Sequence, residues 1–156
     1  MRLIALLLLL AAPALAQDVG FVRVWPGWRD ANSFVHIAEY FGGREDTRGQ
    51  TMLRTQPADR TGFYFLARTR NTGAAQPGAK FVLDIITPDS PHPKTYTFST
   101  SLPSGEHVFN VGLTGNDWAG AKIKPVAWRL RLLAGDGREL TEYRSFLWSM
   151  PPAGER

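Results

Sequence analysis

The chain has 156 residues, of which 44% are hydrophobic and 21% charged, with a formal net charge of +4 and no cysteine. The lack of cysteine excludes thiol catalysis, cysteine-ligated metals, disulfide bonds and a thioether-linked lipid anchor. The 18 lysines and arginines are scattered rather than gathered in one stripe, so the positive charge predicts no nucleic-acid partner.

The first residues are typical of a bacterial secretory signal peptide. Arg2 precedes an apolar run, and the small residues Ala14 and Ala16 frame a cleavage site before Gln17. The run is shorter than the ~20 residues that span a bilayer, and no later stretch approaches that length. We expect residues 1–16 to be removed and the mature chain, without a membrane span, to be periplasmic, extracellular or on the cell surface.

Two different periodicities follow the signal. Residues 19–25 (VGFVRVW) alternate along their length and predict a first strand, which the following Pro-Gly pair would end. Residues 33–41 (SFVHIAEYF) repeat apolar side chains at helical spacing and precede a Gly-Gly pair that can end a helix. We expect one short helix there, with a strand as the alternative because aromatic and β-branched residues are frequent.

From residue 51 onward, short β-prone segments are separated by glycine- and proline-rich turns about every ten residues. Together with the first strand they make eight predicted strands. The later seven are residues 51–55, 62–70, 79–87, 94–100, 107–113, 126–134 and 139–148. The pattern predicts a mainly β, antiparallel sandwich in a single domain over residues 17–150, with a disordered tail at 151–156.

Residues 128–148 form the most regular segment, a predicted hairpin with a two-residue turn at Asp136-Gly137. That turn would pair Leu133 with Leu140, Arg131 with Glu142, Leu130 with Tyr143, Arg129 with Arg144 and Trp128 with Ser145. The face that carries Trp128 and the leucines should be buried. The opposed arginines argue against this register unless a longer loop over residues 135–138 shifts it.

Residues 62–88 (GFYFLARTRNTGAAQPGAKFVLDIITP) run from one strand through Asn-Thr-Gly and Pro-Gly turns into another. The segment resembles the B to C region of immunoglobulin-like or fibronectin-type modules of exported bacterial proteins. The resemblance implies an immunoglobulin-like β-sandwich that mediates binding or holds other domains apart. No cysteine pair of the antibody type accompanies it.

Residues with catalytic or metal-binding chemistry are sparse. His36, His92 and His107 lie far apart without metal-ligand spacing, and the nucleophile and phosphate-loop motifs are missing. We therefore predict no catalytic residue, no metal and no cofactor. A hydrolase with Glu39 and Asp59 as acid and base is a remaining alternative.

Aromatic residues at predicted strand ends are the candidate binding groups. Trp25 and Trp28 flank a rigid Pro-Gly turn that would hold two indoles close together, and Trp118 lies in a loop. Trp25, Trp28 and Trp118 thus form a candidate aromatic platform for a sugar or a protein. The alternative is that these indoles pack over the open end of the sandwich.

The expected function is that of a non-catalytic exported module that binds a protein partner or supports an envelope assembly. The alternative is a carbohydrate-binding module that uses the three tryptophans. The sequence leaves the identity of the partner, the strand order and the oligomeric state open.

Overall fold

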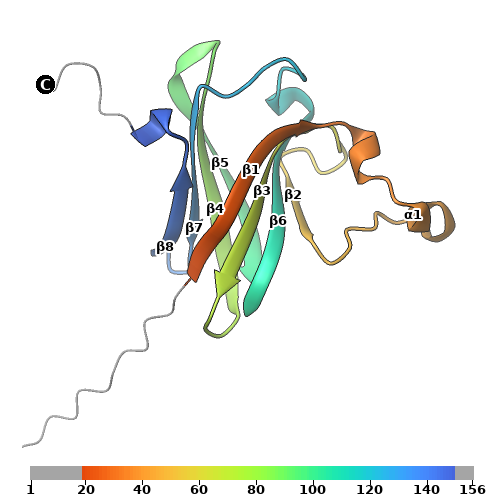
Figure 1. Cartoon of the computed structure of the whole chain (residues 1–156), viewed down its shortest axis with the longest axis horizontal. Helices are drawn as coiled ribbons and strands as arrows, with labels where there is room; N and C mark the ends of the chain where they lie inside the picture. Colours follow the sequence, from red (N-terminus) through yellow and green to blue (C-terminus); the bar gives the residue numbers. More distant parts are fainter. Residues whose placement is uncertain (1–18, 150–156) are drawn as a thin grey trace, which may run out of the picture.

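The computed structural model describes residues 19–149, which form two four-stranded sheets packed against each other (Figure 1). Sheet A has the strand order β1-β3-β6-β2, and sheet B has the order β5-β4-β7-β8. The strands are β1 (Val19–Arg29), β2 (Thr51–Arg54), β3 (Gly62–Asn71), β4 (Gln76–Thr87), β5 (Ser90–Leu102), β6 (Gly105–Thr114), β7 (Ala127–Leu133) and β8 (Glu139–Arg144). The mainly β, eight-stranded sandwich is confirmed. The predicted signal peptide and tail lie outside the described residues.

The strand order is that of an immunoglobulin-type sandwich. β1, β3 and β6 occupy the positions of strands A, B and E, while β4, β5, β7 and β8 occupy those of C, C′, F and G. β2 occupies the edge next to β6 but runs parallel to it, so the expectation of a purely antiparallel sandwich is wrong here. The pattern of a strand does not contain its direction, which is set by the long connection that returns the chain to the start of β2 (Figure 1).

The interior between the sheets is filled by alternate residues of the central strands. Fully buried members include Phe65, Ala67, Phe81, Leu83, Phe109, Val111, Leu130 and Leu132. Burial of one large apolar side chain contributes about 1.5 to 3 kcal/mol, more than the roughly 0.2 to 1 kcal/mol of a cross-strand pair. This interior therefore determines which face of each strand points inward.

β1 does not end before Pro26. Its pairing with β3 continues without a shift from Arg23, opposite Arg68, to Arg29, opposite Gly62. Proline lacks a backbone N–H, but β1 is an edge strand whose outer N–H groups need no partner within the sheet. The prediction that the first strand ends at the Pro-Gly pair is therefore wrong.

The prediction of one helix over residues 33–41 is also wrong. The chain forms a 3-10 turn at Ala31–Phe34 and a six-residue helix α1 (Ile37–Gly42), with two extended residues between them. Asp30 caps the first segment by accepting a hydrogen bond from the Ser33 N–H at 2.9 Å, and Gly43, at φ 65°, ends the second. Separate caps split the apolar repeat into two short segments. No helical segment of residues 19–149 has the length and apolar character of a membrane span.

The β7–β8 hairpin confirms the central part of the predicted register. Leu130 lies opposite Tyr143, Arg131 opposite Glu142 and Arg129 opposite Arg144, and the Ser145 N–H donates to the Trp128 carbonyl at 2.9 Å. Trp128, Leu130 and Leu132 are buried, as expected.

The turn of this hairpin is a three-residue loop rather than the predicted two-residue turn. The Ala134 N–H donates to the Arg138 carbonyl at 2.8 Å, and Gly137 adopts φ 87° within the loop. Leu133 consequently faces Glu139 instead of Leu140, and a bulge next to this pair restores the register. β8 ends at Arg144, not at residue 148, and a 3-10 turn follows at Leu147–Ser149.

Candidate functional site

Residues 30–50, called the arm below, leave β1, extend past β2 with α1 near the tip, and return to β2 (Figure 1). The arm covers part of the outer face of sheet A, because Phe34 packs on Tyr64 with 4.8 Å between ring centroids. Tyr64 points away from sheet B, yet it is 1% exposed under this cover, and burial raises its pKa.

An arginine on β2 fastens the arm. Arg54 donates to the two carboxylate oxygens of Glu45 at 2.8 and 2.5 Å, and its Nε donates to the Tyr64 hydroxyl at 2.8 Å. The Arg54 guanidinium lies 5.2 Å from the centre of the Phe34 ring, and its side chain is 6% exposed. The hydrogen bond from Arg54 holds the pKa of Glu45 below its usual range. We call this group of Phe34, Glu45, Arg54 and Tyr64 the clamp.

Glu39 and Asp59, the acid and base of the hydrolase alternative, do not lie in the environment that this catalysis requires. Glu39 accepts a hydrogen bond from Arg60 at 2.8 Å, and this bond lowers the pKa of its carboxyl. Asp59 lies beside Gly115 and, together with Trp28, lines a shallow hollow. A glycosidase acid needs a carboxyl held protonated, whereas Glu39 is held ionised.

The three histidines are on separate elements: His36 is on the arm, His92 near the start of β5 and His107 on β6. The His107 Nε2 lies 2.8 Å from the Thr51 hydroxyl, and burial lowers the pKa of this imidazole. Within residues 19–149, no three histidine, aspartate or glutamate side chains are grouped as metal ligands.

The three candidate tryptophans have different surroundings. Trp25 pairs with Leu66 and Trp28 with Phe63, so the two indoles point to opposite faces of β1. Trp25 is 40% exposed, whereas Trp28 packs against the core. The expected turn that would bring them together does not form.

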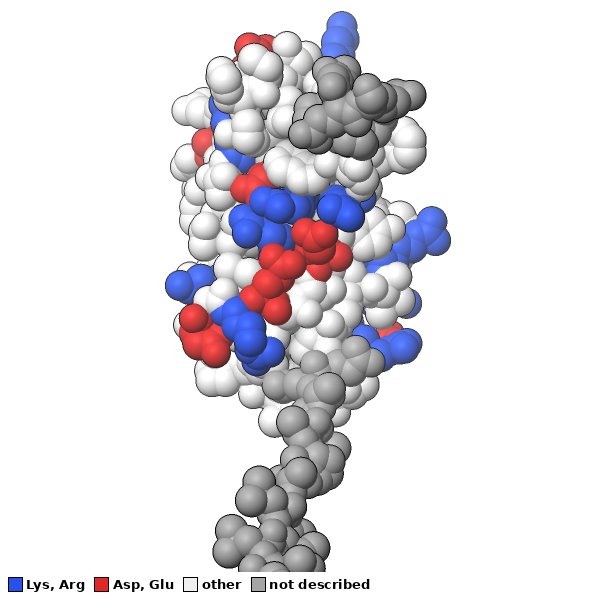
Figure 2. All heavy atoms as spheres, turned by 90° about the vertical axis from the view of Figure 1, so that its left-hand side faces the viewer, with Lys and Arg blue, Asp and Glu red and all other residues white. Residues whose placement is uncertain are grey.

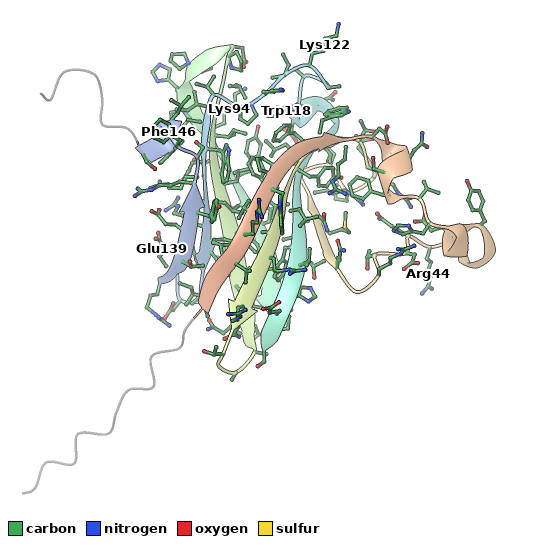
Figure 3. The ribbon with its side chains drawn as sticks, in the orientation of Figure 1. Arg44, Lys94, Trp118, Lys122, Glu139 and Phe146 are labelled. Atoms are coloured by element: carbon green, nitrogen blue, oxygen red, sulfur yellow. The ribbon has the colours of Figure 1, made fainter. Side chains whose placement is uncertain are left out.

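Trp118 lies at one end of the sandwich (Figure 3). It is 7% exposed, its ring centroid is 4.7 Å from that of Phe63, and its Nε1 donates to the Gly120 carbonyl at 3.1 Å. For Trp118 the structure therefore shows packing over the end of the core, which was the alternative expectation.

The four sheet edges differ in how they are protected against further pairing. β1 has a bulge and contains Pro26, β2 is only four residues long, and β8 is short, bulged and charged. β5 pairs with β4 without a shift from Lys94 to Thr100, and residues 95–102 (TYTFSTSL) contain no charge and no proline. Within residues 19–149, its other side has no partner strand. Short length, proline, charge and bulges are the usual protections of edges. Pro91, Pro93 and Lys94 lie at the start of β5, but residues 95–100 have none of these protections.

A groove runs between this edge and β2. It is lined by Met52, Leu53, Arg54 and Pro57 on one side and by Thr97, Phe98 and Ser99 on the other. Phe98 and Tyr96 point toward the interior, while Thr95, Thr97 and Ser99 are exposed. The edge therefore presents alternating apolar and polar side chains beside unpaired backbone groups.

The outer face of sheet B carries a band of opposite charges, part of which is visible in Figure 2. Asp84 accepts hydrogen bonds from Arg129 and Arg131, both at 3.0 Å, and from Thr95 at 2.7 Å. Burial acts to raise the pKa of Asp84, but the Thr95 hydroxyl and the two arginines outweigh it, so the pKa is lowered. Asp84 thus compensates the charge of Arg129, while Arg144, which lies opposite Arg129, pairs with Glu142 at 3.4 Å.

No protein-family model matches the chain, and no curated protein matches it. Among solved structures, the chain is similar to an immunoglobulin-like protein from Pseudomonas aeruginosa, with a TM-score of 0.38 and 15% sequence identity. The similarity covers 83% of this chain and 96% of that one. Similarity at this level assigns no activity.

Sequence reasoning missed both the clamp and the β5 edge. Arg54 lies in the strand predicted over residues 51–55, and Glu45 lies between that strand and the predicted helix. Nothing in their spacing indicates that they meet. The β5 edge did have a signal, namely the eight-residue stretch at 95–102 without charge or proline. That signal becomes informative only once the strand is known to lie at an edge.

Proposed function

We propose that this chain is a non-catalytic β-sandwich module that binds another protein by adding an extended segment of that protein to the β5 edge. The free edge at residues 95–102 carries the proposal, because it is long, uncharged and free of proline. Backbone groups on such an edge bind water or a further strand, and strand addition is a common mode of peptide recognition.

The groove defines the chemistry of the partner segment. Side chains on one face of an added strand would lie toward Leu53 and Phe98, and those on the other face would lie beside Thr97 and Ser99. We therefore propose a partner strand with alternating apolar and polar residues. It would occupy the position of strand C″ in variable-type immunoglobulin domains.

The predicted signal peptide supports a role outside the cytoplasm, as a periplasmic or cell-surface module of an envelope assembly. Sugar binding has less support, because Trp118 is packed in the core and Trp25 and Trp28 face opposite sides of β1.

The test is selection of peptides from a displayed random library on the purified exported protein. We expect selected peptides to have alternating polarity and to slow amide hydrogen exchange in β5. The double variant Thr97→Lys/Ser99→Lys should abolish binding, because lysines on an edge strand oppose pairing. The control Val22→Lys, at an exposed position on the β1 edge, should bind as the parent does.

Protection confined to another element, or unchanged binding by the double variant, would contradict strand addition at β5. Protection of β5 that increases with protein concentration in the absence of peptide would instead assign the edge to a second copy of this chain.

A further inference from the structure

A cavity of about 180 Å³ lies between the arm and the outer face of sheet A. Leu66 and Asn110 belong to the sheet side, and the arm forms the opposite wall. The clamp holds that wall in place, since Glu45 lines the cavity while both of its carboxylate oxygens bind Arg54. The cavity adjoins the groove of β5, because Met52 lines both, but its chemistry is different.

Two arginines line the cavity without an acidic partner. Arg29 stands at the end of β1, and its guanidinium lies 5.8 Å from the centre of the Phe34 ring. Arg48 is on the arm. Neither guanidinium forms an ion pair or a hydrogen bond with another residue in the described part of the chain.

The acceptors of the cavity are largely used within the protein. Asp46 Oδ1 accepts from the Arg48 backbone N–H at 3.0 Å, and Asp46 is the one lining carboxylate not bound by an arginine. Gln50 Oε1 accepts from the amide of Asn110, which is 1% exposed, at 2.7 Å. This bond orients the carboxamide of Gln50 and leaves its own N–H₂ group as a donor. Arg54 neutralises Glu45, so the two unpaired arginines face one unpaired carboxylate, Asp46, and positive charge is in excess in the cavity.

We propose that this cavity binds a small oxyanion, a carboxylate or a phosphate, through Arg29, Arg48 and the Gln50 amide. A guanidinium presents paired N–H groups that match the oxygens of either anion, which makes arginine the usual residue for such recognition. The volume admits a small molecule or a single charged headgroup, and not a folded segment. This site is independent of the partner strand proposed for β5.

The test is titration of the purified protein with succinate, inorganic phosphate and, as a neutral analogue, succinamide. Binding is followed by calorimetry and by the NMR signals of the Gln50 and Asn110 side-chain amides. We expect saturable binding of succinate or phosphate, no binding of succinamide, and shifts of both amides. Binding of one anion alone identifies it as carboxylate or phosphate chemistry.

Three variants distinguish binding of the anion in the cavity from nonspecific electrostatic attraction. Arg29→Gln should weaken binding at least about tenfold, as expected for loss of a charged hydrogen bond. Gln50→Glu retains an acceptor for Asn110 but places a negative charge on the cavity wall, and should abolish binding. Arg44→Gln is the control, because Arg44 lies on the arm but does not line the cavity (Figure 3).

Arg44→Gln should change the affinity less than about twofold, since a charge outside the site is screened by solvent and salt. Circular dichroism and thermal unfolding establish that each variant is folded. Equal weakening by Arg29→Gln and Arg44→Gln, binding of succinamide as tight as that of succinate, or no saturable binding up to millimolar anion would overturn the proposal.

Discussion

The clamp on sheet A and the charged band on sheet B use the same chemistry in different ways. In the clamp, Arg54 is 6% exposed and lies between an aromatic ring and Glu45. In the band, the side chains of Arg129 and Arg131 are 31% and 25% exposed and share Asp84. A buried guanidinium that loses its partner cannot recover hydration, whereas a half-exposed one can. The clamp should therefore hold a segment in place, while the band mainly neutralises a strand face.

The largest expected effect comes from Glu45→Gln. The substitution leaves Arg54 buried without its carboxylate, so we expect a loss of about 2 to 4 kcal/mol in the free energy of unfolding, measured by urea denaturation. Hydrogen exchange should also increase in the arm. Glu106→Gln is the control, because its pair with Arg70 is exposed to solvent and its loss should destabilise the fold much less than the loss of Glu45. Equal losses in the two variants would remove the distinction between clamp and surface pair.

A smaller effect is expected from Asp84→Asn in the band. The freed arginines can turn toward water, so we expect a loss of about 1 to 2 kcal/mol that changes with salt concentration. The folded-state pKa of Asp84 is lowered from its ordinary 3.8. Its contribution is therefore present above pH 3.8 and lost as the pH falls below that value through the folded-state pKa. Acid titrations of the parent and the variant should diverge above this window and converge below it.

The smallest effect concerns His107, which contacts Thr51 where the arm joins β2. Burial lowers the pKa of this imidazole from 6.5, so its neutral form is favoured in the folded state. We expect the free energy of unfolding to decrease as the pH falls below 6.5 toward the folded-state pKa. In His107→Gln this part of the pH dependence should disappear. A parent protein with constant stability across this window would show that the imidazole is accessible to water in the fold.

Much of the sandwich could be predicted from local patterns. All eight strands follow from alternation and turn residues, and the burial of Trp128, Leu130 and Leu132 follows from the face on which they stand. Cross-strand register in the hairpin was largely predictable too, because a one-residue slip would expose the apolar face. The length of the hairpin loop was not predictable, because the bulge beside Leu133 offsets the extra loop residue and leaves the buried pairs unchanged.

The candidate sites depend on contacts between residues distant in sequence. The stack of Phe34 on Tyr64, the bond from Arg54 to Glu45 and the position of Asp84 beside two arginines have no local signature. The relative placement of Trp25 and Trp28 could not be predicted locally either, because Pro26 is compatible with both a turn and an edge strand. Only the position of β1 at the edge of sheet A decides between these two outcomes.

By itself, the sequence determined the β class, the strand segments and the inward faces, because alternation of side chains is a property of each strand alone. Tertiary structure decided the parallel direction of β2, the shape of the arm and which strands lie at the four edges of the sandwich. Strand direction and neighbours depend on connections and on burial summed over the whole fold, and no single segment contains that information.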